Sequence, residues 1–183
     1  LRFFTVFGSA EFAVRPFIVA DQERALKTLR QWTKDTDEKV RRLASEGSRP
    51  RLPWGMRLST LVRDPSPTLV ILEALKDDES LFVRRSVANH LNDITKDHPE
   101  FVLERLEAWD LGREHLRWIA KQACRTLIKR GHPRALKLFG FGKKAEVTAT
   151  LKASPQCLEL GERLTLTAVI TSTSRQSQRL AVD

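Results

Sequence analysis

The sequence has little cysteine and no long apolar run. Its two cysteines, Cys124 and Cys157, form no CxxC pair and lie in segments of different character, which argues against a disulfide framework and against a zinc site. The apolar stretches are short and interrupted by charges, so membrane spanning and secretion are both disfavoured. These absences predict a protein of the reducing cytoplasm without a membrane partner.

Several motifs of catalytic chemistry are absent as well. The sequence contains no glycine-rich phosphate-binding loop, no cluster of metal ligands and no serine triad. The four histidines, at positions 90, 98, 115 and 132, are scattered along the chain. We therefore expect no metal and no cofactor, and hydrolysis that depends on a metal is disfavoured.

Length and composition bound the number of domains. At 183 residues, with 41% hydrophobic and 30% charged residues, the chain is long enough for one full core plus something extra, and too apolar to be disordered. One or two domains are expected. Because the chain begins with Leu1 and not with Met, we also expect a fragment of a longer protein.

Charge is concentrated in the first part of the chain. The formal net charge is +9, and residues 1–143 hold 27 of the 32 lysines and arginines but only 19 of the 23 acidic residues, an excess of +8. A polyanion is thus the first partner to consider for this part, although many basic globular proteins bind no nucleic acid.

From Ser9 to about Phe139 the apolar residues recur at helical spacing, and the breaks fall at Pro, Gly or Asp-rich points. Ser9 can cap the first helix, which runs through Glu11. Further helices are predicted over residues 21–34, 37–47, 56–62, 67–76, 80–96, 99–109 and 113–130.

Two of these helices resemble each other. Residues 37–44 (DEKVRRLA) and 80–88 (SLFVRRSVA) superimpose at an offset of 43 residues, Val40 upon Val83, and a weaker copy follows at residues 116–120. The offset is within the range of HEAT-type repeats, roughly 40 to 47 residues. The pattern predicts a stack of helix pairs in which one face of every second helix lines a concave surface.

After Gly140 and Gly142 the apolar pattern changes to period two, in residues 147–151 and 163–170, which predicts the opening of an all-β domain. About 40 residues give three or four strands, whereas an immunoglobulin-like sandwich needs roughly seven. The rest of such a domain is therefore expected to be missing.

The predicted fold is mainly α. A HEAT-like helical-repeat solenoid occupies residues 1–142, and a partial immunoglobulin-like β domain occupies residues 143–183.

Polar side chains follow one face of each repeated helix. Arg42 and Glu46 share the face opposite to the buried stripe in the first, and Arg85, Asn89 and Asp93 form the exposed row of the second. Such rows can be solvated pairs worth a few tenths of a kcal/mol. The repeat favours a functional role for these polar side chains, because equivalent positions in stacked helices converge in space.

The helix predicted over residues 113–130 carries cations at every fourth position: Arg113, Arg117, Lys121, Arg125 and Lys129. A stripe of one charge sign repels itself unless an anion neutralises it, and a phosphate backbone is the obvious candidate. A merely solvated helix face remains the alternative.

The segment 45–55 (SEGSRPRLPWG) is the least ordinary in the chain. Its prolines and glycines predict a shaped loop that displays Arg49, Arg51 and Trp54 next to Glu46. A nucleic-acid site can use both kinds of side chain, guanidinium for phosphate and indole for stacking on a base. Trp54 could instead be a hydrophobic plug under the loop.

Three motifs resemble the HEAT-like alkylpurine DNA glycosylases, most closely the AlkC branch of the AlkC/AlkD family. They are residues 9–17 (SAEFAVRPF), 40–54 (VRRLASEGSRPRLPW) and 83–93 (VRRSVANHLND). The resemblance spans residues 1 to about 140, and some AlkC members carry a C-terminal immunoglobulin-like domain. AlkC-like chains have helices ahead of the first motif, so we expect the solenoid to lack its N-terminal helices here.

The resemblance implies excision of cationic bases such as 3-methyladenine, without a metal. It places the catalytic site where Glu11, Glu46 and Asp93 converge, with Trp54 at its border and Arg42 nearby. AlkD proteins use tryptophans and an aspartate around the lesion; Asn89 stands at the position of one such tryptophan, which favours an AlkC-type site.

The chemistry agrees with this implication. An N3-alkylated purine already carries a positive charge and leaves readily, so what remains is to stabilise an oxocarbenium-like sugar and to position a water, which carboxylates can do. We expect Trp54, Asn89 and His90 to contact the lesion. The residues expected on the DNA are Arg42, Arg49, Arg51, Arg85, Arg117, Lys121 and Arg125.

The predicted partner is thus double-stranded alkylated DNA, bound by a monomer associated with the nucleoid. Two other functions remain open. A HEAT solenoid can grip nucleic acid or an acidic protein without catalysis, in which case the carboxylates only pair with arginines. A pure protein-interaction repeat is the third possibility.

Overall fold

The computed structural model describes residues 1–141, 145–178 and 180. It divides the chain into two compact units, Leu1–Ala135 and Leu136–Asp183. The domain boundary predicted after residue 142 falls within residues 142–144, which lie outside the described residues. No helix of the described residues is both long and apolar enough to span a bilayer.

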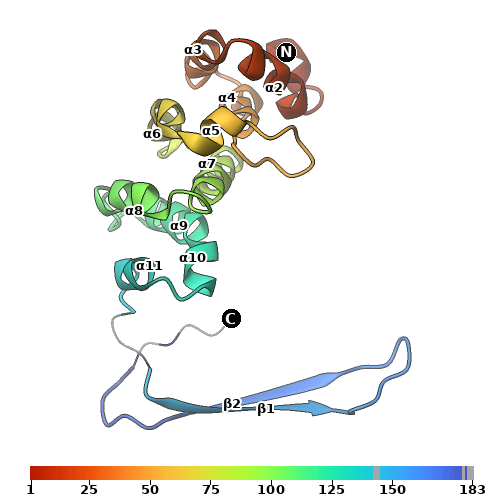
Figure 1. The fold of residues 1–183 in the computed structure, drawn as a ribbon, viewed down its shortest axis with the longest axis vertical. Coiled ribbons are helices and arrows are strands. Elements are labelled where there is room, and N and C mark those ends of the chain that lie inside the picture. The colour runs from red at the N-terminus through yellow and green to blue at the C-terminus, as the bar shows by residue number, and fades with distance from the viewer. Residues whose placement is uncertain (142–144, 179, 181–183) are drawn as a thin grey trace. The chain divides into compact units, whose positions relative to one another are not determined.

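The described part of the first unit is built from helices (Figure 1). In chain order they are α1 (Arg2–Thr5), α2 (Glu11–Ala20), α3 (Gln22–Trp32), α4 (Glu38–Gly47), α5 (Ser59–Arg63), a 3-10 turn (Ser66–Thr68), α6 (Leu69–Leu75), α7 (Leu81–Ile94), α8 (Pro99–Glu107), α9 (Glu114–Ala123) and α10 (Arg125–Lys129). Helix α11 (Pro133–Leu138) follows. The prediction of a mainly α, helical-repeat fold is confirmed.

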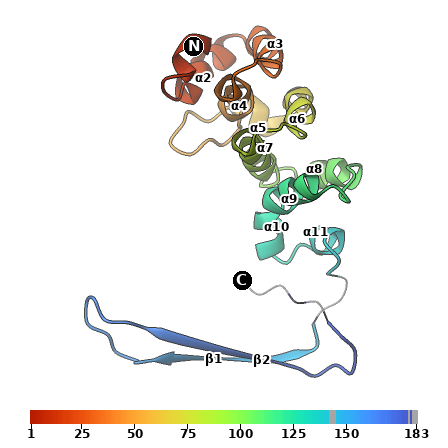
Figure 2. The ribbon, with the colours of Figure 1, turned by 180° about the vertical axis from the view of Figure 1, so that it is seen from behind.

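The helices of the first unit form two layers (Figures 1 and 2). One layer is the succession α4, α7 and α9, each packed on the next, and the other contains α3, α6 and α8. The apolar stripes predicted from the sequence lie between them. Their most deeply buried members include Val40, Leu43, Val83, Val87, Leu91 and Ile119.

The 43-residue repeat is visible in the turns that precede α4 and α7. Asp37 and Ser80 cap these helices by accepting from the backbone N–H groups of Lys39 and Phe82. Arg41 donates to the carbonyls of residues 35 and 36 at 3.0 Å each, and Arg84 donates to those of residues 78 and 79 at 2.6 and 2.8 Å. The same turn is therefore built twice.

Two helix predictions are wrong in detail. Helix α2 begins after Ala10 without a side-chain cap, and the Ser9 hydroxyl instead lies 3.5 Å from Arg42 Nη1. The helix predicted over residues 113–130 is interrupted at Cys124. The Asn92 side chain accepts from the backbone N–H and the hydroxyl of Thr126 at 3.4 and 3.0 Å, so α10 starts on a contact from α7.

The described part of the second unit contains one antiparallel hairpin, β1 (Val147–Ser154) and β2 (Thr165–Ser172), in which Val147 pairs with Ser172. Three or four strands were predicted, but residues 155–164 form a long connection between these two. Alternation places Leu151, Leu166 and Ile170 on one face of the ladder. An immunoglobulin-like identity of this unit stays a prediction.

Candidate active site and nucleic-acid interface

Glu46 lies in the last turn of α4 and is the centre of a buried polar cluster. Arg49 Nη1 donates to Glu46 Oε1 at 2.7 Å, and the Ser86 hydroxyl of α7 donates to Glu46 Oε2 at 2.6 Å. The carboxylate is almost fully shielded from solvent. Because each oxygen has its own donor, the plane of the carboxylate is fixed.

Asp93 shares the same arginine. Arg49 Nε donates to Asp93 Oδ2 at 2.8 Å, and Lys96 Nζ lies 3.1 Å from Asp93 Oδ1. Asp93 was predicted on the exposed row of its helix with Arg85 and Asn89, but only 1% of it is exposed. Asp93 can be buried at this position because Arg49 and Lys96 neutralise its carboxylate.

Arg49 is an interior residue and not a displayed phosphate ligand, which corrects the expectation that it binds DNA. Only 6% of it is exposed. Burial by itself lowers the pKa of Arg49, but the hydrogen bond and charge of Asp93 and the charge of Glu46 outweigh it, so this pKa lies above its ordinary value. A permanent cation therefore joins two carboxylates from α4 and α7.

Glu11, at the start of α2, is brought to the same place. Arg42 lies between the two glutamates, with Nη1 at 3.8 Å from Glu11 Oε2 and Nη2 at 3.6 Å from Glu46 Oε1. Its guanidinium stacks over the Phe82 ring, 4.6 Å from the centroid. The buried Glu11 Oε2 accepts no hydrogen bond from any described residue. One carboxylate oxygen of the cluster thus keeps its capacity to accept.

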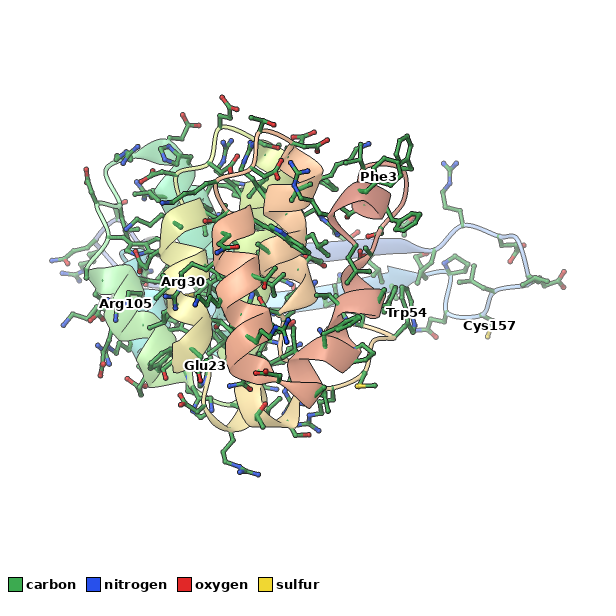
Figure 3. The ribbon with its side chains drawn as sticks, turned by 90° about the horizontal axis from the view of Figure 1, so that it is seen from above. Phe3, Glu23, Arg30, Trp54, Arg105 and Cys157 are labelled. Carbon is green, nitrogen blue, oxygen red and sulfur yellow. The ribbon has the colours of Figure 1, made fainter. Side chains whose placement is uncertain are left out.

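The α4–α5 loop, residues 48–58, carries Trp54. Trp54 is 99% exposed and adopts a left-handed backbone conformation, φ 58°, so it does not fill a cavity under the loop. Figure 3 shows it on the side of the helical unit opposite to Arg105 of α8. Arg51 also lies on this loop and is held by Asp97 through two hydrogen bonds of 2.6 Å.

Asn89 and His90 differ in position. The Asn89 side chain, partly exposed, accepts from Arg125 Nη2 at 3.1 Å. His90 is fully buried, with Nδ1 at 3.0 Å from the carbonyl of Ser45, and burial together with the Arg49 charge lowers its pKa to about 3. This location argues against contact between His90 and a base.

The predicted cations follow the layer of α4, α7 and α9. Arg85, Arg117 and Lys121 are exposed, whereas Arg125 is half-buried and is the residue that contacts Asn89. The interruption at Cys124 divides the predicted stripe between α9 and α10. Within the described ranges, no cluster of three or more His, Cys, Asp or Glu side chains is arranged to hold a metal ion.

Sequence reasoning missed three polar residues of this region: Arg15, Ser86 and Lys96. A signal existed for the second. Ser86, His90 and Asp93 are spaced by four and three residues, which puts them on one face of α7, and that face is buried. Arg15 carries no such signal, because its partners lie more than 30 residues further along the chain.

Fold and site together define an α-helical repeat protein in which a cluster of carboxylates lies within a layer of basic helices. A model of the DNA alkylation repair enzyme family matches residues 3–127. The chain belongs to this family.

Two solved structures separate the branches. The chain is 54% identical to the Pseudomonas fluorescens alkylpurine DNA glycosylase AlkC, which is bound to DNA containing an abasic site analog, with a TM-score of 0.88 over 95% of this chain and 49% of that one. Against AlkD2 from Streptococcus mutans the values are 30% identity and a TM-score of 0.55, over 64% of this chain and 55% of that one. The resemblance to the AlkC branch is confirmed.

The chain is also similar to about half of a protein from Bacillus subtilis. The protein YhaZ of Bacillus subtilis is 46% identical over 181 residues, which are 98% of this chain and 51% of that protein. The chain thus spans about half the length of YhaZ and of the AlkC structure.

Proposed function

We propose that this protein is a DNA glycosylase that removes cationic alkylated purines such as 3-methyladenine by hydrolysing the N-glycosidic bond. One observation carries the proposal: three carboxylates from α2, α4 and the end of α7 are linked through Arg42 and Arg49. The similarity to an AlkC structure bound to abasic-site DNA supports the same conclusion.

The proposed reaction needs no strong general acid. The bond between C1′ and the purine N9 breaks with its electron pair passing to the base, which leaves as a neutral molecule. The positive charge left on the sugar is stabilised by nearby carboxylates that are already ionised and oriented. Water then attacks C1′ and gives up a proton to a nearby carboxylate, so the products are the free base and an abasic site.

The hydrogen bonds favour different roles for the three acids. Glu11 has an oxygen that is paired with Arg42 at 3.8 Å but accepts no hydrogen bond from a described residue, so we assign it to the attacking water. Glu46, with both oxygens held, is suited to stabilising the sugar cation as a fixed negative charge. Asp93 is the most deeply buried and completes the pairing of Arg49.

The surroundings of the acids supply DNA contacts in this proposal. Trp54 is suited to stacking on a base or filling a gap in the duplex, and Asn89 to a contact at the lesion. Phosphates would be bound by the exposed cations among Arg42, Arg51, Arg85, Arg117, Lys121 and Arg125. We propose a monomer acting on chromosomal DNA in the nucleoid.

The decisive experiment measures release of labelled 3-methyladenine from methylated duplex DNA. Glu11→Gln, Glu46→Gln and Asp93→Asn remove one charge each with little change of shape. We expect losses on the order of 10²-fold for the first two, the usual cost of removing one preorganised electrostatic group. Glu104→Gln, which changes an exposed carboxylate on α8, should leave the rate unchanged.

Folding and affinity for undamaged DNA are measured for every variant, because Glu46 and Asp93 are buried. If the parent protein binds DNA tightly but releases no base, the glycosylase proposal is wrong, and the carboxylates only pair with arginines in a DNA-binding scaffold.

A further inference from the structure

Arg15 is a fully buried cation whose hydrogen bonds go to backbone carbonyls. Its Nη1 donates to the carbonyls of Gly47 and Arg49 at 3.1 and 2.9 Å, and its Nε donates to that of Met56 at 2.5 Å. None of its surface is exposed. A buried cation is costly unless its surroundings repay the lost hydration, so this residue requires an explanation beyond packing.

All three carbonyls lie at the ends of the α4–α5 loop. Gly47 and Arg49 flank its beginning and Met56 lies near its end, so one planar guanidinium bridges the base of the loop. The other described main-chain bonds within the loop are few: Leu58 N–H donates to the carbonyl of Pro50 at 3.2 Å and Gly55 N–H to that of Leu52 at 3.1 Å.

Close approach of α2 and α4 makes the bridge possible. At Gly47 a Cβ atom would lie 2.4 Å from Val14 Cγ1, nearer than two carbon atoms can come. The absence of a side chain there lets the helices meet at the point where Arg15 reaches the carbonyls.

We propose that Arg15 is a positioning residue, which fixes the α4–α5 loop against α2 and thereby sets Trp54 and Arg49 relative to Glu11. Arg15 and Glu11 are four residues apart on α2 and both are buried, so they share one face of this helix. Arg49 accepts from Arg15 at its carbonyl and donates to Glu46 and Asp93 from its side chain. A shift of the loop would move both the displayed indole and the cation between the carboxylates.

The inference rests on the proposed function for its catalytic consequence but not for its structural test. Arg15→Lys keeps a cation but replaces the planar fork by a single ammonium. We expect trypsin to cut after Arg51 and Arg57, inside the loop, about tenfold faster than in the parent, the effect of losing one or two charge-assisted hydrogen bonds. Mass spectrometry identifies the cut bonds.

Arg41→Lys is the matched control. Arg41 is also a buried arginine with two hydrogen bonds to carbonyls, but it holds the turn before α4 and does not touch the loop. This variant should leave the two loop bonds as resistant as in the parent. Arg15→Gln, which keeps a neutral donor, is the second variant if Arg15→Lys folds poorly.

Each outcome either supports or overturns the proposed role of Arg15. Faster cutting confined to the loop in an Arg15 variant supports the proposal. Equal protection of the loop in the Arg15 and Arg41 variants overturns it, as does a failure of both Arg15 variants to fold while Arg41→Lys folds, since Arg15 then serves the whole domain. Base release adds the functional arm: Arg15→Lys should lower kcat more than affinity for undamaged DNA. A parent without activity would reject only the glycosylase proposal.

Discussion

At the scale of single residues, the unusual feature is the number of polar groups in the interior of α7. Ser86, His90 and Asp93 occupy a face that an ordinary helix would fill with apolar side chains. Each has a partner in α4 or in the loop that follows it. The contact between these two helices therefore combines apolar packing with a fixed set of hydrogen bonds, which orients Glu46 and Asp93.

His90 makes stability depend on pH. Its pKa is lowered from 6.5 to about 3 in the folded protein, so between these values the unfolded chain binds one proton more than the folded one. The contribution is fully present above pH 6.5 and is lost as pH falls, by about 1.4 kcal/mol per pH unit. Urea unfolding at pH 7, 6 and 5 should show stability falling, with a slope that approaches this value between pH 6 and 5, and His90→Gln should reduce the fall. Equal slopes in the parent and the variant would contradict the assignment.

At the scale of elements, the repeated turn is the unit that sets the spacing of the helices. Asp35 and Asp78 each accept, through a side-chain oxygen, from the N–H two residues later. Asp78 also receives Arg41 Nε and Nη2 at 2.7 and 3.0 Å. The turn before α7 is thus held by a hydrogen bond within the turn and by Arg41 of α4, the helix of the preceding pair.

Removing the two kinds of bond should have unequal effects. Asp78→Ala leaves Arg41 without its carboxylate in a mostly buried position and should lower the free energy of unfolding by about 3 kcal/mol. Ser80→Ala removes an N-cap bond and an exposed hydrogen bond from the Ser80 hydroxyl to the Glu38 carboxylate, and should cost about 1 kcal/mol. Chemical denaturation of both variants measures the difference, and an Asp78 variant no less stable than the Ser80 variant would show that the ion pair contributes little.

Helices and repeats could be predicted from the sequence because their signals are local. Val40 and Val83 mark equivalent positions because the segments that contain them match at an offset of 43 residues, and Asp37 and Ser80 were sufficient to locate two helix starts. The interruption at Cys124 could not be predicted, since it depends on Asn92 of another helix.

The acids of the candidate site could be predicted from the sequence, but the positions of its arginine side chains could not. The family resemblance pointed to Glu11, Glu46 and Asp93, and the structure links these acids through Arg42 and Arg49. The inward direction of Arg49 depends on the loop path, which Arg15 sets from 34 residues earlier. Contacts at such separation leave no periodic trace in a sequence.

At the scale of the whole molecule, charge is the property that links fold and function. The excess of cations lies in residues 1–143, and Arg85, Arg117 and Lys121 are exposed on α7 and α9. These helices belong to the same layer as α4. A polyanion that follows this layer would pass the carboxylate cluster and the exposed indole of Trp54.

Salt dependence of DNA binding tests this path. Arg117→Ala should weaken binding to all sequences and reduce the slope of log K against log salt by about 0.9 if one phosphate contact is lost. Arg30→Ala removes an exposed arginine from α3, in the other layer, and should leave the slope unchanged. Equal effects of the two substitutions would indicate attraction by net charge alone.

The duplicated turn also affects how a stack of helix pairs can become longer. Asp35 receives Arg2 from α1 as Asp78 receives Arg41 from α4, so each turn offers one acceptor to the pair before it and carries one donor arginine of its own. A copied helix pair would bring both halves of this joint with it. The architecture can therefore grow by gene duplication in whole pairs, while Glu46 and Asp93, on α4 and α7 of two neighbouring repeats, keep their mutual distance.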